Sequence, residues 1–322
     1  MIYLLLITIL FIIISVYFKI ADKFNIIDKP NERSSHTSIT IRGGGIIFYF
    51  GALSFFIYSG FQYPWFFLGL SFITLISFLD DVLTLSNKLR LSFHLVSMGL
   101  LFYQLDLFEL SWYWIVFAFI LFIGITNAYN FMDGINGITG AYSLAVLGGL
   151  WLINNYHMNF IENDLIYCTG LSLLVFNFYN FRKKAKCFAG DVGSIAIAFI
   201  LLFMIGKLLL LEPSLVPVLL LGVYGVDSVL TIIHRLILKE NIFQAHRKHL
   251  YQILANEAKV PHVIVSASYA VLQMGINCFA LYLLYIDYPV MYVGLLVVGL
   301  LIILALVYVL IKRKYYHLHQ LA

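Results

Sequence analysis

The sequence predicts an all-α polytopic integral membrane protein with about eleven transmembrane helices, its N-terminus outside and its C-terminus in the cytoplasm. Three observations predict this fold class. First, 62% of the 322 residues are hydrophobic and only 11% are charged, whereas a soluble domain carries about 25% charged residues. Second, apolar stretches long enough to approach the width of a bilayer recur along the whole chain. Third, 19 of the 20 Lys and Arg residues fall in alternate gaps between these stretches.

A transmembrane helix needs about 20 mostly apolar residues, with a working range of roughly 17 to 25. We expect eleven helical spans, at about residues 1–17, 44–59, 64–79, 89–103, 112–126, 138–153, 165–179, 194–211, 214–233, 262–285 and 288–311. These runs lack the period-two alternation of a membrane β-barrel. The first stretch has no basic region before it and no small-residue cleavage site, so we expect a permanent span and not a cleaved signal.

The basic residues orient the chain. Those in the alternate gaps are Lys19, Lys23, Lys29, Arg33 and Arg42; Lys88 and Arg90; Arg182, Lys183, Lys184 and Lys186; Arg235, Lys239, Arg247, Lys248 and Lys259; and Lys312, Arg313 and Lys314. Only Lys207 lies within a span. The positive-inside rule therefore places these gaps in the cytoplasm. We treat residues 1–322 as one membrane domain, with main cytoplasmic loops at about 18–43, 80–88, 127–137, 180–193 and 234–261.

Composition excludes several classes of function. The three cysteines, Cys168, Cys187 and Cys278, show no paired spacing, so they indicate neither a disulfide framework nor a zinc site. The net charge of +4 is spread over short loops. That pattern suits anionic lipid headgroups better than nucleic acid, and no nucleic-acid-binding module is recognisable.

The second cytoplasmic loop begins with the adjacent carboxylates Asp80 and Asp81, followed by Lys88 and Arg90. Neighbouring carboxylates at the end of an apolar helix repel each other, and a cation between them compensates. Mg²⁺ is a hard ion that usually takes one or two carboxylates together with substrate phosphates. The alternative is a solvated loop in which Lys88 and Arg90 balance the two aspartates.

The third loop carries Asn127, Asn130 and Asp133, followed by the glycines Gly134, Gly137 and Gly140. If the helix continues to Asp133, these three polar residues lie on one face at i,i+3 spacing and can bind a polar ligand. The glycines permit close backbone approach or positive φ, as phosphate-cradling loops require. Helix packing and ordinary turns are the alternatives.

The fourth loop combines the basic run 182–186 with Gly190-Asp191-Val192-Gly193-Ser194 at the start of the next span. A helix N-terminus attracts phosphate, and Asp191 could hold the metal that bridges to it. Alternatively, Asp191 or Ser194 simply caps the helix.

The fifth loop contains His246, Arg247, Lys248 and His249, a compact cationic group suited to anionic oxygen. A basic segment attracted to lipid headgroups is the alternative. Upstream, Asp227 lies within an expected span, where a carboxylate is by default a candidate functional residue. A purely structural ion pair with Arg235 or Lys207 is an equally good interpretation of Asp227. In the first loop, Arg42 precedes three glycines. This pattern indicates an anion cradle or a plain turn.

Together these motifs resemble the polyprenyl-phosphate N-acetylhexosamine-1-phosphate transferases (glycosyltransferase family 4), in particular the bacterial branch that begins O-antigen or related surface glycans. The matching stretches are Ser34-Ser35-His36 with Arg42-Gly43-Gly44-Gly45, Asp80-Asp81, Asn127-x-x-Asn130-Phe-Met-Asp133-Gly134, Gly190-Asp191-Val-Gly193-Ser194 and His246-Arg-x-His249-x-x-Gln252. Two departures stand out. Ile39 and Ile41 occupy positions where the family often has prolines. His246-Arg-Lys-His249 differs from the three-histidine run of the phospho-N-acetylmuramoyl-pentapeptide transferases and argues against that branch.

The resemblance implies transfer of a sugar 1-phosphate from a UDP-linked N-acetylated hexose to undecaprenyl phosphate, with release of UMP. It implies a Mg²⁺ cofactor, with Mn²⁺ as the alternative, and a multi-pass protein of the bacterial inner membrane whose N-terminus is periplasmic and whose active site faces the cytoplasm. The expected catalytic residues are Asp80, Asp81 and Asp191, and the expected metal ligands are Asp191 and Asp133. The expected substrate-binding residues are Asn127, Asn130, Asp133, Arg42, Lys88, His246, Arg247 and His249.

Two competing functions are weighed. A membrane prenyltransferase also uses carboxylate-bound Mg²⁺, but its paired Asp-rich motifs do not occur in this sequence. A transporter or flippase for an anionic lipid-linked substrate would place polar groups near the bilayer midplane, where this chain has only Asp227 and Lys207. The sequence leaves open which UDP-sugar is used, which glycan the product enters and whether the protein forms a homodimer.

Overall fold

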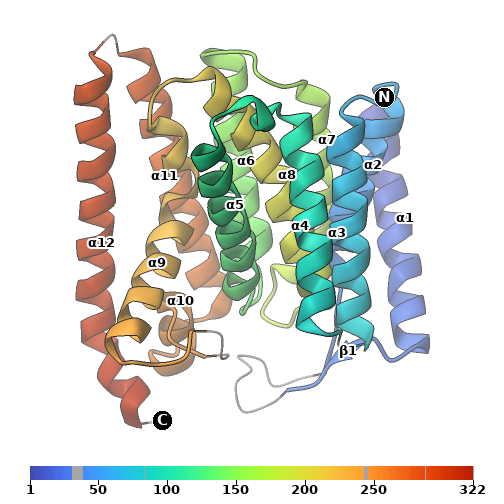
Figure 1. The fold of residues 1–322 in the computed structure, drawn as a ribbon. Coiled ribbons are helices and arrows are strands. Elements are labelled where there is room, and N and C mark those ends of the chain that lie inside the picture. Colours follow the sequence, from blue (N-terminus) through green and yellow to red (C-terminus); the bar gives the residue numbers. More distant parts are fainter. Residues whose placement is uncertain (31–38, 84, 243–245, 287, 322) are drawn as a thin grey trace.

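The protein is a bundle of long helices in this computed structural model, which describes residues 1–30, 39–83, 85–242, 246–286 and 288–321, with side chains up to residue 316. Of these described residues, 79% are helical. Figure 1 shows the helices running side by side, with Met1 at one end of the bundle and the C-terminus at the other. Two short strands and helix α10 also lie at the C-terminal end, which we call the α10 end.

The described elements are, in order, α1 (Ile2–Lys23), β1 (Ile27–Asp28), β2 (Thr40–Ile41), η1 (Gly44–Ile46), α2 (Ile47–Tyr58), α3 (Pro64–Leu83), α4 (Asn87–Gln104), η2 (Leu107–Glu109), α5 (Trp112–Met132), α6 (Ile138–Tyr156), α7 (Asn163–Asn180), α8 (Gly190–Leu211), η3 (Val216–Leu221), α9 (Gly222–Ile237), α10 (Leu250–Gln252), η4 (Ile253–Glu257), α11 (His262–Tyr285) and α12 (Val290–Leu321). The strands β1 and β2 pair antiparallel, with Ile27 opposite Ile41.

Every predicted apolar stretch falls on a helix. In the described part of the chain, seven segments are long and apolar enough to cross a membrane: Ile2–Lys23, Pro64–Leu83, Trp112–Met132, Gly190–Leu211, Val216–Ile237, His262–Tyr285 and Val290–Tyr316. The other predicted stretches correspond to α2, α4, α6 and α7. The prediction of an all-α polytopic membrane protein is confirmed, while the count of eleven spans and the orientation of the termini stay predictions.

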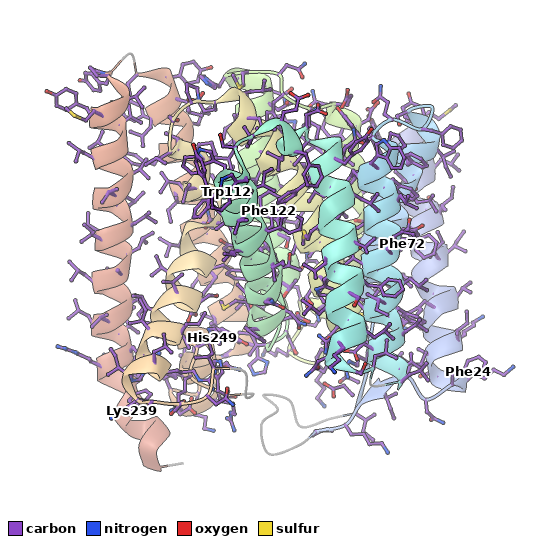
Figure 2. The ribbon with its side chains drawn as sticks, in the orientation of Figure 1. Phe24, Phe72, Trp112, Phe122, Lys239 and His249 are labelled. Atoms are coloured by element: carbon purple, nitrogen blue, oxygen red, sulfur yellow. The ribbon has the colours of Figure 1, made fainter. Side chains whose placement is uncertain are left out.

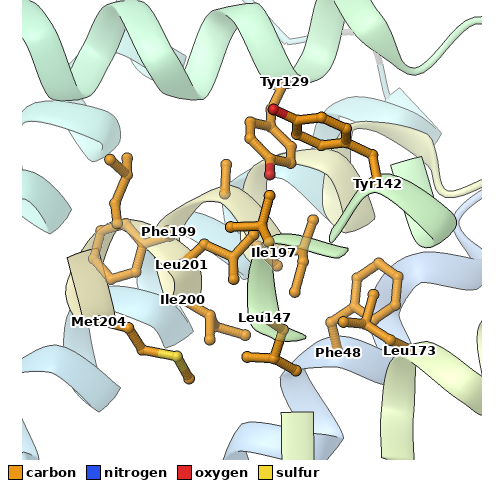
Figure 3. Close-up of a cluster of buried hydrophobic side chains, with 14 of the residues drawn as sticks. Phe48, Tyr129, Tyr142, Leu147, Leu173, Ile197, Phe199, Ile200, Leu201 and Met204 are labelled. Carbon is orange, nitrogen blue, oxygen red and sulfur yellow. The ribbon is translucent and has the colours of Figure 1, made fainter. Parts of the chain in front are cut away.

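Helix α8 is the centre of the bundle. Its sequence is apolar on all sides, as expected for a helix surrounded by protein, and it packs against α2, α3, α5 and α6. Phe199, Ile200 and Leu201 have at most 1% of their surface exposed. Figure 3 shows these side chains in one cluster with Phe48 of α2 and Tyr129 of α5. This packing holds the N-terminal residues of α8 in a defined place at the α10 end.

Two glycines allow the start of α8 to contact the segment before α2 directly. A Cβ atom on Gly193 would lie 2.6 Å from the Cα atom of Gly45, which is closer than real Cβ contacts. The adjoining backbones are also hydrogen-bonded, because Gly44 N donates to Phe188 O at 2.8 Å and Gly45 N donates to Ala189 O at 3.1 Å. This close approach brings Arg42 beside the first turn of α8.

Replacing Gly193 with Ala should therefore destabilise the protein by about 1–3 kcal/mol, because the added methyl group forces two backbones apart. The matched control is Gly124→Ala in α5, where a Cβ atom meets nothing within 4 Å. Thermal unfolding in detergent should show a lower midpoint for Gly193→Ala alone. Equal midpoints for the two variants would refute the close-contact interpretation.

Candidate active site

Three carboxylates and two arginines from four separate segments converge at the α10 end. Asp80 and Asp81 lie in the last turn of α3, and Asp191 lies in the first turn of α8. Arg42 follows β2, and Arg90 is in the first turn of α4. The sequence motifs that carry these residues are far apart along the chain, and the bundle brings them together.

Asp81 is a structural anchor in this cluster. Its side chain has 0% exposure and forms an ion pair with Arg42, with Nε and Oδ1 2.7 Å apart. Its two carboxylate oxygens also accept hydrogen bonds from the backbone N–H groups of Asp191 and Val192, at 3.1 and 3.0 Å. A carboxylate at a helix N-terminus is stabilised by the unpaired N–H groups and the helix dipole.

The capping residue of α8 is therefore not one of those considered from the sequence. From the sequence we considered Asp191 or Ser194 as the cap, and a substrate phosphate as the ligand of the N-terminal amides. In the structure, Asp81 of α3 accepts the hydrogen bonds from these amides. The Ser194 hydroxyl donates to Gly190 O at 3.0 Å. The capping alternatives for Asp191 and Ser194 are wrong in this structure.

Asp80 and Asp81 do not share one cation. Asp80 Oδ2 pairs with Arg90 Nη1 at 2.8 Å, and its Oδ1 accepts a hydrogen bond from Leu85 N at 2.8 Å. Of the alternative, a solvated loop in which Lys88 and Arg90 balance the two aspartates, only the pairing of Arg90 with Asp80 is found; Asp81 is buried against Arg42. Lys88 is exposed on α4.

Asp191 makes the longest ion pairs of the three aspartates. Its two oxygens lie 3.4 Å from Arg42 Nη2 and 3.5 Å from Arg90 Nη2, and 17% of its side chain is exposed. The Asn130 side chain is also hydrogen-bonded to it. Burial lowers the pKa of the Arg42 guanidinium, but Asp81 and Asp191 outweigh that effect and hold the pKa above its ordinary value. Asp191 is thus the carboxylate of this cluster with room to accept another ligand.

The end of α5 supplies the amide and carboxylate groups expected from the third loop. The helix ends at Met132, one residue earlier than the spacing argument assumed, and Asp133 follows it as the C-cap. Thr139 Oγ1 donates to Asp133 Oδ1 at 2.7 Å. Burial raises the pKa of Asp133 to about 6, opposed by the Thr139 hydrogen bond. Asn127 is partly buried one turn before Asn130.

The loop glycines contact protein. A Cβ atom on Gly134 would collide with the Tyr251 hydroxyl, and one on Gly137, which has φ of 86°, would collide with the Phe181 ring. Gly44 is similarly close to Cys187. The expectation that these positions need glycine is confirmed, but their close neighbours are parts of this chain and do not form an open phosphate cradle.

The fifth loop presents its two histidines side by side, although they are not in a helix. The rings of His246 and His249 stack with centroids 5.0 Å apart. Burial, followed by the neighbouring His249, lowers the pKa of His246 to about 3. Lys248 is paired with Glu240, so its charge is already balanced within the protein. Arg247 is partly buried.

Asp227 organises this loop. Its carboxylate lies 3.2 Å from His249 Nδ1 and accepts hydrogen bonds from the Leu250 and Tyr251 N–H groups at 3.0 and 3.4 Å and from the Tyr269 hydroxyl at 2.7 Å. Among the described residues, His249 Nε2 is buried without a hydrogen-bond partner. A histidine held at one ring nitrogen by a carboxylate presents the other nitrogen in a defined direction.

The pairing of Asp227 considered from the sequence is wrong. Arg235 pairs with Glu240 at 3.2 Å, and Lys207 donates to the Tyr63 hydroxyl at 2.7 Å. The partner is His249, 22 residues further along the chain. The only sequence signal for Asp227 was its position within an apolar span, and no such signal marked Tyr251 or Tyr269.

The end of α5 connects the aspartate cluster to the histidine loop. Tyr251 donates its hydroxyl to Phe131 O at 2.9 Å, and the Phe131 ring lies 6.4 Å from that of His246. Figure 2 shows His249 and Lys239 at the α10 end, far from Trp112. The predicted residues thus lie at one end of the bundle, except Ser34-Ser35-His36, which lie outside the described residues.

The cluster has the oxygen ligands that Mg²⁺ prefers. With three carboxylates and two guanidinium groups, its formal net charge is negative by one. Among the described residues, no group of three or more His, Cys, Asp or Glu side chains is already arranged around a common metal position. In this structure Arg42 and Arg90 lie between the carboxylates, and Asp191, at the longer distances, fits a metal ligand best.

Comparison with known proteins shows which proteins this chain resembles. A family model described as "Glycosyl transferase family 4" matches residues 63–208, the segment that contributes Asp80, Asp81, Asn130 and Asp191. The chain is 29% identical to the "Probable undecaprenyl-phosphate N-acetylglucosaminyl 1-phosphate transferase" of Bacillus subtilis (strain 168) over 262 residues, which are 73% of this chain and 71% of that protein. The chain is thus similar to glycosyl transferase family 4 over residues 63–208, and to this undecaprenyl-phosphate sugar-1-phosphate transferase over most of its length.

Two further proteins are similar to this chain. It is 26% identical to the "Undecaprenyl-phosphate alpha-N-acetylglucosaminyl 1-phosphate transferase" of Thermotoga maritima over 281 residues, covering 83% of this chain and 87% of that protein. It is 30% identical to the "Phospho-N-acetylmuramoyl-pentapeptide-transferase" of Dictyoglomus turgidum over 177 residues, covering 48% of this chain and 55% of that protein.

Proposed function

We propose that the protein transfers an N-acetylhexosamine 1-phosphate from a UDP-sugar to undecaprenyl phosphate and releases UMP. An oxygen of the lipid phosphate attacks the phosphorus next to the sugar, and the bond from that phosphorus to the bridging oxygen of UMP breaks. The observation that carries the proposal is the convergence of Asp191 with Arg42, Arg90 and Asn130 at one end of the bundle. All but Arg42 lie within the segment matched by the family model.

This arrangement supports phosphoryl transfer because both substrates are anions. Transfer between two phosphates depends mainly on positioning and on electrostatic stabilisation. We assign Mg²⁺ to Asp191, with Asp80 and Asp133 as further ligand candidates. When bound there, the ion would neutralise charge on the diphosphate and on the leaving UMP. A phosphate monoester with a second pKa near 6 is largely dianionic at pH 7, so it attacks without a strong general base.

We assign the remaining residues to substrate binding or to positioning from their location and exposure. Asn127, Asn130 and Asp133, at the end of α5, bind the UDP-sugar or its metal. His246, Arg247 and His249 contact the sugar phosphate, and the free Nε2 atom of His249 supports this role. Arg42, Arg90 and exposed Lys88 attract the anionic substrates. Asp81, with no exposed side-chain surface, positions α8 and Arg42 and does not touch substrate.

We propose the same orientation as the charge pattern predicts. The α10 end, where Asp80, Asp191 and His249 lie, faces the cytoplasm of a bacterial cell with an inner membrane, and Met1 is periplasmic. The eleven spans then form one transferase domain whose product begins O-antigen, lipopolysaccharide or a related envelope glycan. The placement of the polar groups at one end of the bundle favours the enzyme over a transporter, whose substrate site lies near the midplane.

The test is a panel of UDP-sugars incubated with the purified protein, undecaprenyl phosphate and Mg²⁺. We expect at least one UDP-N-acetylhexosamine to support UMP release and to add the mass of its sugar phosphate to the lipid. Omitting the lipid should abolish the release. Failure of every UDP-N-acetylhexosamine, in an assay where a relative of known activity works, would reject the proposed function.

A further inference from the structure

A pocket separate from the aspartate cluster lies between α9 and α12 at the α10 end. Its volume is about 520 Å³. One part of its wall is apolar and includes Leu230, Ile233 and Ile237 of α9. The other part carries polar or cationic side chains, which are His234, Tyr308, Lys312, Arg313 and Tyr316. None of its lining residues comes from α3, α4, α5 or α8, which carry most of the aspartate cluster.

Lys312 is the central feature of this pocket. Only 6% of its surface is exposed. Its ammonium group donates to the Tyr308 hydroxyl at 2.6 Å and lies 3.5 Å from the Thr231 hydroxyl. Burying a charge in an apolar environment is costly unless an opposite charge compensates it. Two neutral hydroxyl groups do not supply that charge.

The nearby carboxylate, Asp227, is already used. It accepts hydrogen bonds from His249, Tyr269 and two backbone amides. It also accepts one from Thr231 Oγ1 at 3.2 Å. The ion pairs found among the described residues do not include Lys312. The ammonium group therefore has no carboxylate at ion-pair distance within the described part of the chain, and Asp227 acts on it only across the Thr231 hydroxyl, while four other groups already bind that carboxylate.

The position of the pocket indicates which anion would fit. The apolar run of α12 ends where Lys312, Arg313 and Lys314 follow one another, so these basic residues lie near the level of lipid headgroups. Tyr308 and Tyr316 add aromatic rings, as is common at the membrane interface. Ile233 and Ile237 of the opposite wall are 45% and 72% exposed, so an acyl chain has an apolar surface to lie on.

We propose that this pocket binds the phosphate headgroup of an anionic glycerophospholipid, with Lys312 and Arg313 as the cationic contacts and α9 as the acyl-chain surface. The phosphate carries the charge that Lys312 lacks. We assign a phospholipid and not the polyprenyl phosphate substrate, because the pocket lining is separate from the Asp80, Asp81 and Asp191 cluster where the reacting phosphate belongs. The inference does not depend on the proposed transfer reaction.

The test measures lipid binding to the purified full-length protein by native mass spectrometry, with phosphatidylglycerol and phosphatidylcholine as probes. The unchanged protein should retain phosphatidylglycerol in preference to phosphatidylcholine. Lys312→Met should weaken phosphatidylglycerol retention about tenfold or more, as expected for loss of a charge-assisted contact. The matched control is Lys314→Met, which removes an exposed lysine two residues away and should bind like the unchanged protein.

A second variant guards against loss of folding. Ile233→Trp keeps Lys312 but fills the pocket from its exposed rim, so it should also reduce phosphatidylglycerol retention. Unchanged retention in both Lys312→Met and Ile233→Trp, or equal reduction in Lys314→Met, would overturn the proposal. Displacement of phosphatidylglycerol by an equal concentration of undecaprenyl phosphate would also overturn it, because the pocket would then belong to the substrate lipid.

Discussion

Replacing Asp191 with Asn should reduce UMP release by about 10³-fold while leaving the protein folded. The amide keeps the size of the side chain, and its one oxygen can still accept a hydrogen bond from Arg42, whose Nη2 atom lies 3.4 Å from Asp191 Oδ1. It cannot supply the negative charge that a metal ligand needs. Because 17% of the Asp191 side chain is exposed and its ion pairs are long, little folding energy depends on it.

Comparing Asp191→Asn with Asp81→Asn distinguishes a loss of activity alone from a loss of both activity and stability. Asp81 is fully buried, pairs with Arg42 at 2.7 Å and accepts two backbone N–H groups of α8. Its replacement should lower the unfolding midpoint as well as the activity, since Asn has one accepting oxygen and leaves a buried donor without its partner, at a cost of about 1–3 kcal/mol. Asp22→Asn, on an exposed residue near the end of α1, is the control for both. Near-normal UMP release by Asp191→Asn would reject the assignment of Asp191 as the metal ligand.

The helices could be predicted because each one depends on local composition. A run of about 20 apolar residues satisfies its own backbone hydrogen bonds and needs a bilayer or a protein interior around it. The gaps that carry Arg42, Asp80 and Asp191 could also be assigned to one side, because basic residues mark those gaps. The gap that carries Asn130 has no basic residue and follows from the alternation of spans. This one-sided distribution is sufficient to group the candidate residues at one face of the membrane.

The partners within the group could not be predicted in the same way. Asp81 caps α8 from α3, 110 residues away along the chain, and no local motif encodes such a contact. The glycines around Gly44 and Gly134 indicated a close approach, but a glycine does not reveal whether its neighbour is a phosphate or a side chain such as Tyr251. Side-chain partners depend on tertiary packing, which one sequence does not display.

Asp227 is the clearest example, because its carboxylate in α9 determines how the histidine loop is held. Replacing Asp227 with Asn should reduce UMP release about 10²-fold per folded molecule, as expected when the carboxylate that orients a functional histidine is lost. It should also destabilise the protein, because Asn cannot accept hydrogen bonds from His249, Tyr269 and the Leu250 N–H group together.

A matched variant distinguishes orientation of His249 from support of the fold. Tyr269→Phe removes one donor to the same carboxylate, at 2.7 Å, but leaves the 3.2 Å contact between Asp227 and His249. It should lower the unfolding midpoint, by about 1 kcal/mol in free energy, and keep UMP release per folded molecule close to normal. If Asp227→Asn also kept near-normal release per folded molecule, its role would be structural. A loss of activity confined to Asp227→Asn would show that the carboxylate acts through the imidazole, whose Nε2 atom is the one left for the substrate.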